Sequence, residues 1–308
     1  LDLLVPELSL AESVQFWGTR RDRVSTSEVL DVLSVTGGVP RYLEEVDPAL
    51  SADENIRRMC FRPNGYLFRD FDDIFSTVFA ANSVLKRRVL ETLAHGMMGG
   101  AELAAELKVA RNGQFTEMMR ELELAGFVSV ETGTNPESGK RMRDVRYRLR
   151  DNYSRFYLKY VLPHAAEIRS GRYEFATLEA LPEWNAILGL QFENLVLNNF
   201  HSLLKGLHLE GVQVFSAAPF RKIGKGRGRG VQIDLLIQTK KSLVVVEVKR
   251  QGEIGESVER EVEEKVARLK VKPGLSVRTA LVYAGHLAKG VRSSGSFDAI
   301  VSAEELLA

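Results

Sequence analysis

Residues 243–246, Leu-Val-Val-Val, restrict the fold of this 308-residue sequence more than any other stretch. An uninterrupted apolar run of this kind is typical of a strand buried on both faces of a sheet. Residues 232–238 and 277–284 predict strands before and after it, residues 257–269 predict a charged helix, and residues 303–307 a short terminal helix. Because helices and strands alternate from residue 181 onward, we expect an α/β layer fold there.

The buried strand ends in charged residues that suit metal chemistry. Glu247 and Lys249 are two positions apart, so they point to the same side of the strand. Asp234 lies thirteen positions earlier, in a strand that a hairpin would bring beside Glu247, and Glu193 lies in a long helix predicted over 184–204. Carboxylates hold the hard cation Mg²⁺, which assists phosphodiester hydrolysis. The alternative is a solvent-exposed Glu and Lys at a strand end.

The order of these residues resembles that of the PD-(D/E)XK nuclease superfamily, which has a restriction-endonuclease-like fold. The resemblance implies that Asp234 and Glu247 coordinate Mg²⁺ or Mn²⁺, and that Lys249 positions or activates the attacking water. It assigns Glu193 to the upstream acidic residue of the family. An active nuclease and an inactive nuclease-like domain both remain open.

The N-terminal half predicts helices and then a winged helix. Ser9 with Glu12 and Ser25 with Glu28 have the spacing of capping boxes. Helices over 78–94, 101–107 and 113–125 precede strands over 127–130 and 145–150, which is the outline of a winged helix-turn-helix. Four aromatic residues follow in a helical connector and are expected to pack between domains: Tyr153, Phe156, Tyr157 and Tyr160.

Two clusters of basic residues stand out, although 42 basic and 41 acidic side chains give a net charge of only +1. Such clusters can follow a phosphate backbone. The alternatives are a solvated charged face or contacts with another protein domain. In the return strand, Val145, Tyr147 and Leu149 are expected on one face and the arginines on the other. The candidate nucleic-acid residues are Arg111, Arg143, Arg146 and Arg148 in the winged helix, and Arg221, Lys222, Lys225, Arg227 and Arg229 in a glycine-rich loop.

The residues Thr36-Gly37-Gly38-Val39-Pro40-Arg41, followed by the winged helix and Asp151-Asn152-Tyr153, resemble the C-terminal part of a family of archaeal and bacterial AAA-type ATPases. The resemblance implies that Arg41 is a nucleotide sensor, although a plain helix–helix turn explains the glycines equally well. The sequence contains no P-loop pattern. We therefore expect ATP to bind only to a P-loop ATPase domain that is absent from this sequence. This domain is an expected partner of the chain. The sequence also does not begin with Met.

The sequence thus predicts a multidomain α+β chain. Its expected parts are a helical lid fragment (1–62), a linker (63–77), a winged helix (78–150), a helical connector (151–180) and an α/β nuclease-like domain (181–308). A single cysteine excludes an internal disulfide, and no long uncharged run predicts a membrane helix, so a cytoplasmic location is expected. DNA is the expected partner, a homo-oligomer is possible, and a catalytically inactive DNA- or protein-binding module is the alternative function.

Overall fold

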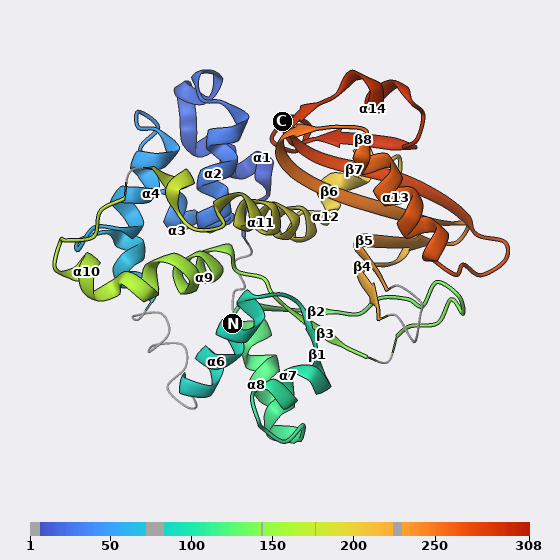
Figure 1. Ribbon diagram of the computed structural model, residues 1–308, viewed down its shortest axis with the longest axis horizontal. Helices are drawn as coiled ribbons and strands as arrows, with labels where there is room; N and C mark the ends of the chain where they lie inside the picture. Colours follow the sequence, from blue (N-terminus) through green and yellow to red (C-terminus); the bar gives the residue numbers. More distant parts are fainter. Residues whose placement is uncertain (1–6, 72–82, 143, 176, 224–229) are drawn as a thin grey trace. The chain divides into compact units, whose positions relative to one another are not determined.

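The computed structural model describes residues 7–71, 83–142, 144–175, 177–223 and 230–308. The protein is a mixed α+β structure that divides into two compact units (Figure 1). Unit 1 consists of Leu1–Val130 and Asp144–Gln191, and unit 2 of Glu131–Arg143 and Phe192–Ala308. Helix α11 (Trp184–Asn198) therefore begins in unit 1 and ends in unit 2.

Helices dominate the described part of unit 1. They are α1 (Leu10–Ser13), α2 (Thr26–Thr36), α3 (Pro40–Leu43), α4 (Ala52–Cys60), α6 (Ser83–Ala94), α7 (Gly100–Glu106), α8 (Gly113–Leu124), α9 (Asn152–Phe156) and α10 (Ala165–Arg169), with 3-10 or π turns at Val14–Arg23, Tyr157–Val161, Leu162–His164 and Leu178–Ala180. The helices predicted over 101–107 and 113–125 correspond to α7 and α8. The one predicted over 78–94 corresponds to α6, and its first residues lie outside the described part of the chain.

Hydrogen bonds to side chains fix the starts of the first helices. Ser9 and Glu12 form the predicted capping box at α1. Ser25 caps α2 by accepting from the backbone N–H of Glu28, whereas the carboxylate of Glu28 accepts from the backbone N–H of Ala52. Helix α2 ends at Gly37, whose φ of 58° suits glycine.

The aromatic residues of the predicted connector lie in the core of unit 1. The ring of Tyr157 stacks on Phe71 at 4.1 Å, and Tyr153 packs edge-on against Tyr42 at 5.0 Å. Phe156 packs against Phe61 in the same way at 5.9 Å. These rings are buried, but the partners named here belong to the same unit, so these contacts do not lie between two units as expected.

A small three-stranded sheet is formed by segments between and after helices α6–α8. Its strands are β1 (Met98–Gly99), β2 (Val128–Glu131) and β3 (Arg146–Leu149), in the order β1-β3-β2. The two predicted strands are present as β2 and β3. The third, β1, was not predicted because two residues, one of them glycine, carry no strand pattern.

Unit 2 is built on a mixed five-stranded sheet with the order β4-β5-β6-β7-β8. The pairs β4/β5 and β5/β6 are antiparallel, whereas β6/β7 and β7/β8 are parallel. The elements are β4 (Val214–Lys222), β5 (Val231–Thr239), β6 (Ser242–Ile254), α13 (Ser257–Arg268), β7 (Ser276–Leu287), α14 (Lys289–Ser293), β8 (Ala299–Ser302) and α15 (Ala303–Leu306). Strands β4 and β8 were not predicted.

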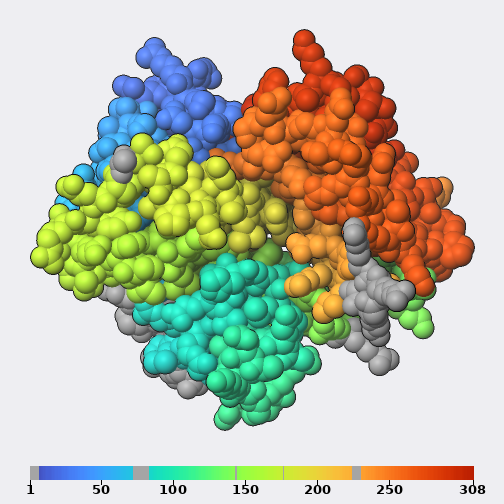
Figure 2. Space-filling view, viewed as in Figure 1, coloured from blue at the N-terminus to red at the C-terminus, as the bar shows by residue number. Residues whose placement is uncertain are grey.

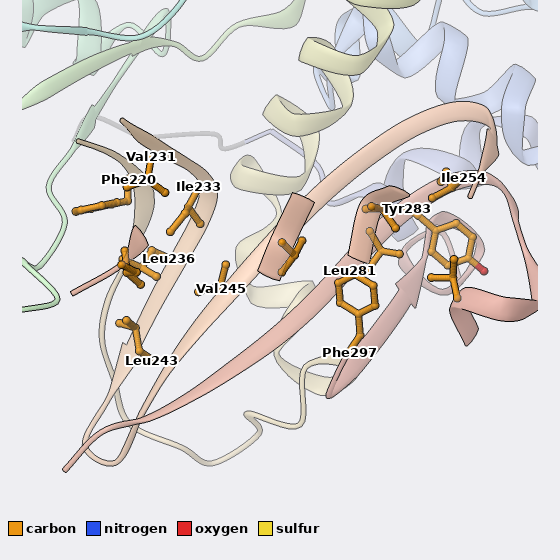
Figure 3. Packing of buried hydrophobic residues seen from close by; sticks show 14 of the residues in the cluster. Phe220, Val231, Ile233, Leu236, Leu243, Val245, Ile254, Leu281, Tyr283 and Phe297 are labelled. Carbon is orange, nitrogen blue, oxygen red and sulfur yellow. The ribbon is translucent and has the colours of Figure 1, made fainter. Parts of the chain in front are cut away.

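The core of unit 2 lies between this sheet and α13. Val258 and Val262 of α13 pack on a cluster that includes Val245 of β6 and Leu281 of β7. Figure 3 shows Val245 and Leu281 on neighbouring strands of this core. In the space-filling view the orange-to-red atoms of the C-terminal elements form one continuous body (Figure 2). The residues buried on α13 recur one turn apart, which is why the charged helix prediction holds.

Residues 131–143, assigned by sequence to the wing, pack with unit 2. The hydroxyl of Thr134 donates to Ser216 Oγ at 2.6 Å, and the backbone N–H of Lys272 donates to the carbonyl of Pro136 at 2.8 Å. Met142 packs against the core cluster. This hairpin, which Thr134 and Arg141 close as a bridge, is therefore part of the body that carries the sheet.

The helix predicted over 184–204 is wrong in its continuity. It breaks into α11 and α12 (Phe200–Gly206), and the break falls at Asn199, whose φ of −107° and ψ of 30° are not helical. Within the described residues, no helix combines the length and the apolar character needed to cross a bilayer.

Candidate active site

The β5–β6 hairpin brings the predicted carboxylates together. Leu235 pairs with Val246 in the antiparallel register, so the next step of that register sets Asp234 opposite Glu247. Asp234 Oδ2 accepts a hydrogen bond from the backbone N–H of Val248 at 2.9 Å. Glu247 is only 1% exposed although it ends a run of valines. The proximity of these two carboxylates, predicted from their spacing, is confirmed.

A β-bulge lies at Asp234. Strand β4 pairs Ala218 with Leu236 and Phe220 with Ile233, so β5 uses one residue more than β4 over this interval. Asp234 and Leu235 are the two residues within it. A bulge changes the direction of a side chain and is common beside functional sites. Pro219 lies on the β4 side of this interval, where an edge strand tolerates the missing N–H.

Burial makes the carboxylates of this site hard to ionise. Burial, then repulsion from Asp234 and Glu247, raises the pKa of Glu193 to about 8. Burial, then repulsion from Asp234, raises the pKa of Glu247 to about 7, against the opposing effect of Lys265. Burial also raises the pKa of Asp234. Glu193 on α11 therefore belongs to the same electrostatic cluster as the hairpin carboxylates, as its predicted role requires.

Two glutamates and two lysines form a closed ring of ion pairs, which we call the charge ring. Lys249 Nζ lies 2.9 Å from Glu247 Oε1 and 2.9 Å from Glu261 Oε2. Lys265 Nζ lies 2.5 Å from Glu247 Oε2 and 3.1 Å from Glu261 Oε1. Each carboxylate thus binds both ammonium groups. Burial opposes the ionisation of Glu261, but Lys249 and Lys265 lower its pKa to about 2.

Glu261 and Lys265 were not identified from the sequence. They lie one turn apart on α13, whose buried residues are Val258 and Val262. A glutamate and a lysine at this spacing on a charged helix usually form an exposed pair. The signal that distinguishes them is position, since Glu261 directly precedes the buried Val262 and so borders the apolar stripe.

The site has an excess of negative charge that fits a divalent cation. Glu193, Asp234, Glu247 and Glu261 contribute four negative charges when ionised, and the two lysines neutralise two, which leaves a formal charge of −2. Carboxylate oxygens are the ligands that Mg²⁺ prefers. Among the residues that the structure describes, no three acidic, His or Cys side chains are already arranged as a metal centre. Lysines hold both Glu247 oxygens instead.

The basic residues predicted near this site are only partly described. Arg221 and Lys222 are exposed at the end of β4, paired in register with Gln232 and Val231 of β5. Arg221 and Lys222 therefore lie beside residues of β5 that come only a few positions before Asp234. The other predicted basic residues of this loop, and one of the wing, lie outside the described residues: Lys225, Arg227, Arg229 and Arg143.

The arginines of residues 78–150, which were predicted to form a winged helix, differ in exposure. Arg111 is exposed just before α8, and Arg146 is half-buried. Arg148, on the face predicted to carry the arginines, is only 8% exposed, so this face of β3 is covered as well. Arg150 lies 3.8 Å from the carboxylate of Glu7 in unit 1. Burial, then repulsion from Asp151, raises the pKa of Glu7, and Arg150 and Arg148 oppose this rise.

Arg41, the predicted nucleotide sensor, makes several local contacts in unit 1. Its guanidinium lies 4.3 Å from the centre of the Tyr66 ring and pairs with Glu44 at 2.9 Å and Glu45 at 2.8 Å. The adjoining glycine turn is tight, because a Cβ on Gly38 would lie 2.2 Å from the carbonyl oxygen of Leu8. Close approach of the backbone thus accounts for this glycine without a ligand.

No family model matches the chain. Over 228 residues the chain is 26% identical to "Uncharacterized protein MJECL04" of Methanocaldococcus jannaschii. The aligned region covers 72% of this chain and 48% of that protein. The chain thus spans about half the length of this relative. The chain also aligns with the crystal structure of protein VC1899 from Vibrio cholerae, with 13% identity and a TM-score of 0.31. This alignment covers the whole of this chain and 61% of the VC1899 chain.

Proposed function

We propose that unit 2 carries a divalent-metal-dependent nuclease centre of the PD-(D/E)XK type. The observation that supports it is the cluster of the half-buried Glu193 and Asp234 with the buried Glu247, beside Lys249, at a hairpin and a helix. A fold gains no stability by gathering buried carboxylates that repel one another, because each such burial is unfavourable. A function that needs negative charge at one point explains the arrangement.

Each residue has a separate task in this proposal. Asp234 and Glu247 would hold Mg²⁺ or Mn²⁺, which supplies Lewis-acid activation of water and of the scissile phosphate. Lys249 orients the attacking water and balances the charge that develops on the phosphate. Glu193 accepts a proton readily in the metal-free protein, since burial and its acidic neighbours raise its pKa to about 8, and it would supply a further carboxylate beside the two ligands when it ionises.

The remaining parts of the chain would deliver DNA to this centre. We propose that helices α6–α8 and the small sheet act as a winged helix, with Arg111 at the start of α8 as a DNA contact. Arg221 and Lys222 would bind the phosphate backbone near the site. Because the chain spans 48% of its archaeal relative, we further propose a P-loop ATPase domain as its partner in a longer protein. The single cysteine, Cys60, is free and buried, which agrees with a reducing compartment such as the cytoplasm.

A second candidate function follows from the charge ring. Both oxygens of Glu247 are held by lysines, a state that suits a nuclease-like module that no longer cleaves and only binds nucleic acid. The two functions differ in metal-dependent cleavage, whereas both predict DNA binding that weakens with salt.

The deciding experiment is incubation of the protein with supercoiled, linear and branched DNA in Mg²⁺ or Mn²⁺. Asp234→Asn and Glu247→Gln remove a ligand charge with little change of shape, and Glu44→Gln, on the surface of unit 1, is the matched control. Cleavage by the parent and the control, lost in both site variants, establishes the nuclease. Binding without cleavage in all four proteins supports the second candidate.

A further inference from the structure

The ammonium group of Lys265 is paired with the carboxylate of Glu247, which a metal ion would need. Its ammonium group lies 2.5 Å from Glu247 Oε2, the shortest contact of the charge ring, and only 15% of its side chain is exposed. Lys249 holds the other oxygen of Glu247 at 2.9 Å and is 25% exposed. A cation cannot bind Glu247 through an oxygen that still carries an ammonium group, so one side of the ring has to open.

The two lysines differ in how they reach Glu247. The ammonium group of Lys265 lies nearer to the Glu247 carboxylate than that of Lys249, at 2.5 Å against 2.9 Å, and its side chain is the less exposed of the two. Lys249 lies on β6, two positions after Glu247, whereas Lys265 reaches the carboxylate from α13. Lys265 is therefore the lysine that pairs most closely with Glu247 and comes from outside the strands that carry the proposed ligands.

Glu261 provides a second partner for Lys265 outside the proposed ligand pair. The two residues are one helical turn apart on α13, and their charged groups lie 3.1 Å from each other. Val258 and Val262 anchor the helix in the core of unit 2. The lysine can therefore leave Glu247 by a side-chain rotation and keep an ion pair while the helix stays in place.

We propose that Lys265 is an internal counter-ion of the site, and that a divalent cation binds Asp234 and Glu247 by displacing its ammonium group from Glu247. The inference rests on the proposed function, since it assumes that these carboxylates bind metal. It predicts that the native lysine weakens metal binding, and that Lys265 does so several times more than Lys249, although both carry the same charge in the same ring.

The test is calorimetric titration of the full chain with Mn²⁺, compared among the parent, Lys265→Met and Lys249→Met. Both variants lose one positive charge beside Glu247, so the general electrostatic effect is matched. We expect Lys265→Met to tighten Mn²⁺ binding by about tenfold or more, as loss of a buried ion-pair competitor implies, and by several times more than Lys249→Met. Lys265→Arg, which keeps the charge, is expected to bind no more tightly than the parent.

Several outcomes would overturn the inference. If Lys249→Met tightens binding as much as Lys265→Met, the effect is one of net charge and Lys265 has no special place. If the parent binds Mn²⁺ and Lys265→Met binds it equally or more weakly, Lys265 supports the metal and does not compete with it. If no protein binds Mn²⁺, both the inference and the proposed metal site fail. Lys265→Gln, with a polar side chain, repeats the test should the methionine variant not fold.

Discussion

Asp234 holds the strand that carries its partner carboxylate, because its Oδ2 atom accepts the backbone N–H of Val248 at 2.9 Å. Asp234→Asn keeps an acceptor at this point and removes a buried charge, whereas Asp234→Ala loses the acceptor. We expect Asp234→Ala to unfold more easily than Asp234→Asn, by about 1–2 kcal/mol. Urea unfolding in EDTA measures the difference. Equal stability of the two variants would show that this bond does not support β6.

The raised pKa of Glu193 makes stability depend on pH. A carboxyl whose pKa is higher in the folded than in the unfolded protein takes up a proton on folding, so the free energy of unfolding falls as pH rises between the two values. For Glu193 these are its usual 4.5 and about 8. We expect the metal-free protein to lose on the order of 2 kcal/mol between about pH 6 and pH 8.

Unfolding at the two pH values, compared with Glu193→Gln, tests this expectation. The glutamine cannot ionise, so its stability should fall much less over the same interval. The parent and the variant would have parallel pH profiles if Glu193 were ionised throughout.

Gln191 holds together three elements of unit 1. Its amide donates to the carbonyls of Ser34 at 2.8 Å and Asn152 at 2.7 Å, and its oxygen accepts from Arg155 at 2.7 Å. We expect Gln191→Leu to destabilise unit 1 by about 2–4 kcal/mol, since it leaves buried groups without these bonds. Thermal unfolding followed by near-UV circular dichroism measures it. Gln114→Leu, the same change on an exposed position of α8, is the control and should have little effect.

The exposed end of β4 should contribute to DNA affinity without sequence preference. Arg221→Ala and Lys222→Ala are each expected to weaken binding and to reduce the slope of log affinity against log salt by about 1. Fluorescence anisotropy at several salt concentrations gives the slope. Lys205→Ala, an exposed lysine at the end of α12, is the matched control. An unchanged slope in the first two variants would remove β4 from the DNA surface.

Local rules allowed part of the site to be predicted. Asp234, Glu247 and Lys249 follow from strand alternation and a hairpin, which act over a few residues. Glu261 and Lys265 enter the site only because α13 crosses the sheet with its valines inward. That placement depends on contacts between residues distant in the sequence. From the sequence alone, Glu261 and Lys265 could not be distinguished from an exposed pair one helical turn apart.

The fold shows the same division between local and distant causes. Capping at Ser9 and the hairpin register were predictable because neighbours determine them. The burial of Arg148 was not predicted, because it depends on residues such as Glu7 that are far away in the sequence. Strand β4 was missed because it contains Pro219 and two alanines, which are poor strand formers in isolation.

Unit 2 is assembled from two separate segments of the sequence, and this limits how the protein can be divided. Residues 131–143 belong to unit 2, but their neighbours on both sides, Val130 and Asp144, belong to unit 1. A gene fragment that begins at residue 192 would therefore encode the sheet without Met142 and without the hydroxyl of Thr134 that binds Ser216. Transfer of the sheet between proteins as one segment from residue 192 would therefore separate it from residues 131–143, which belong to the same unit.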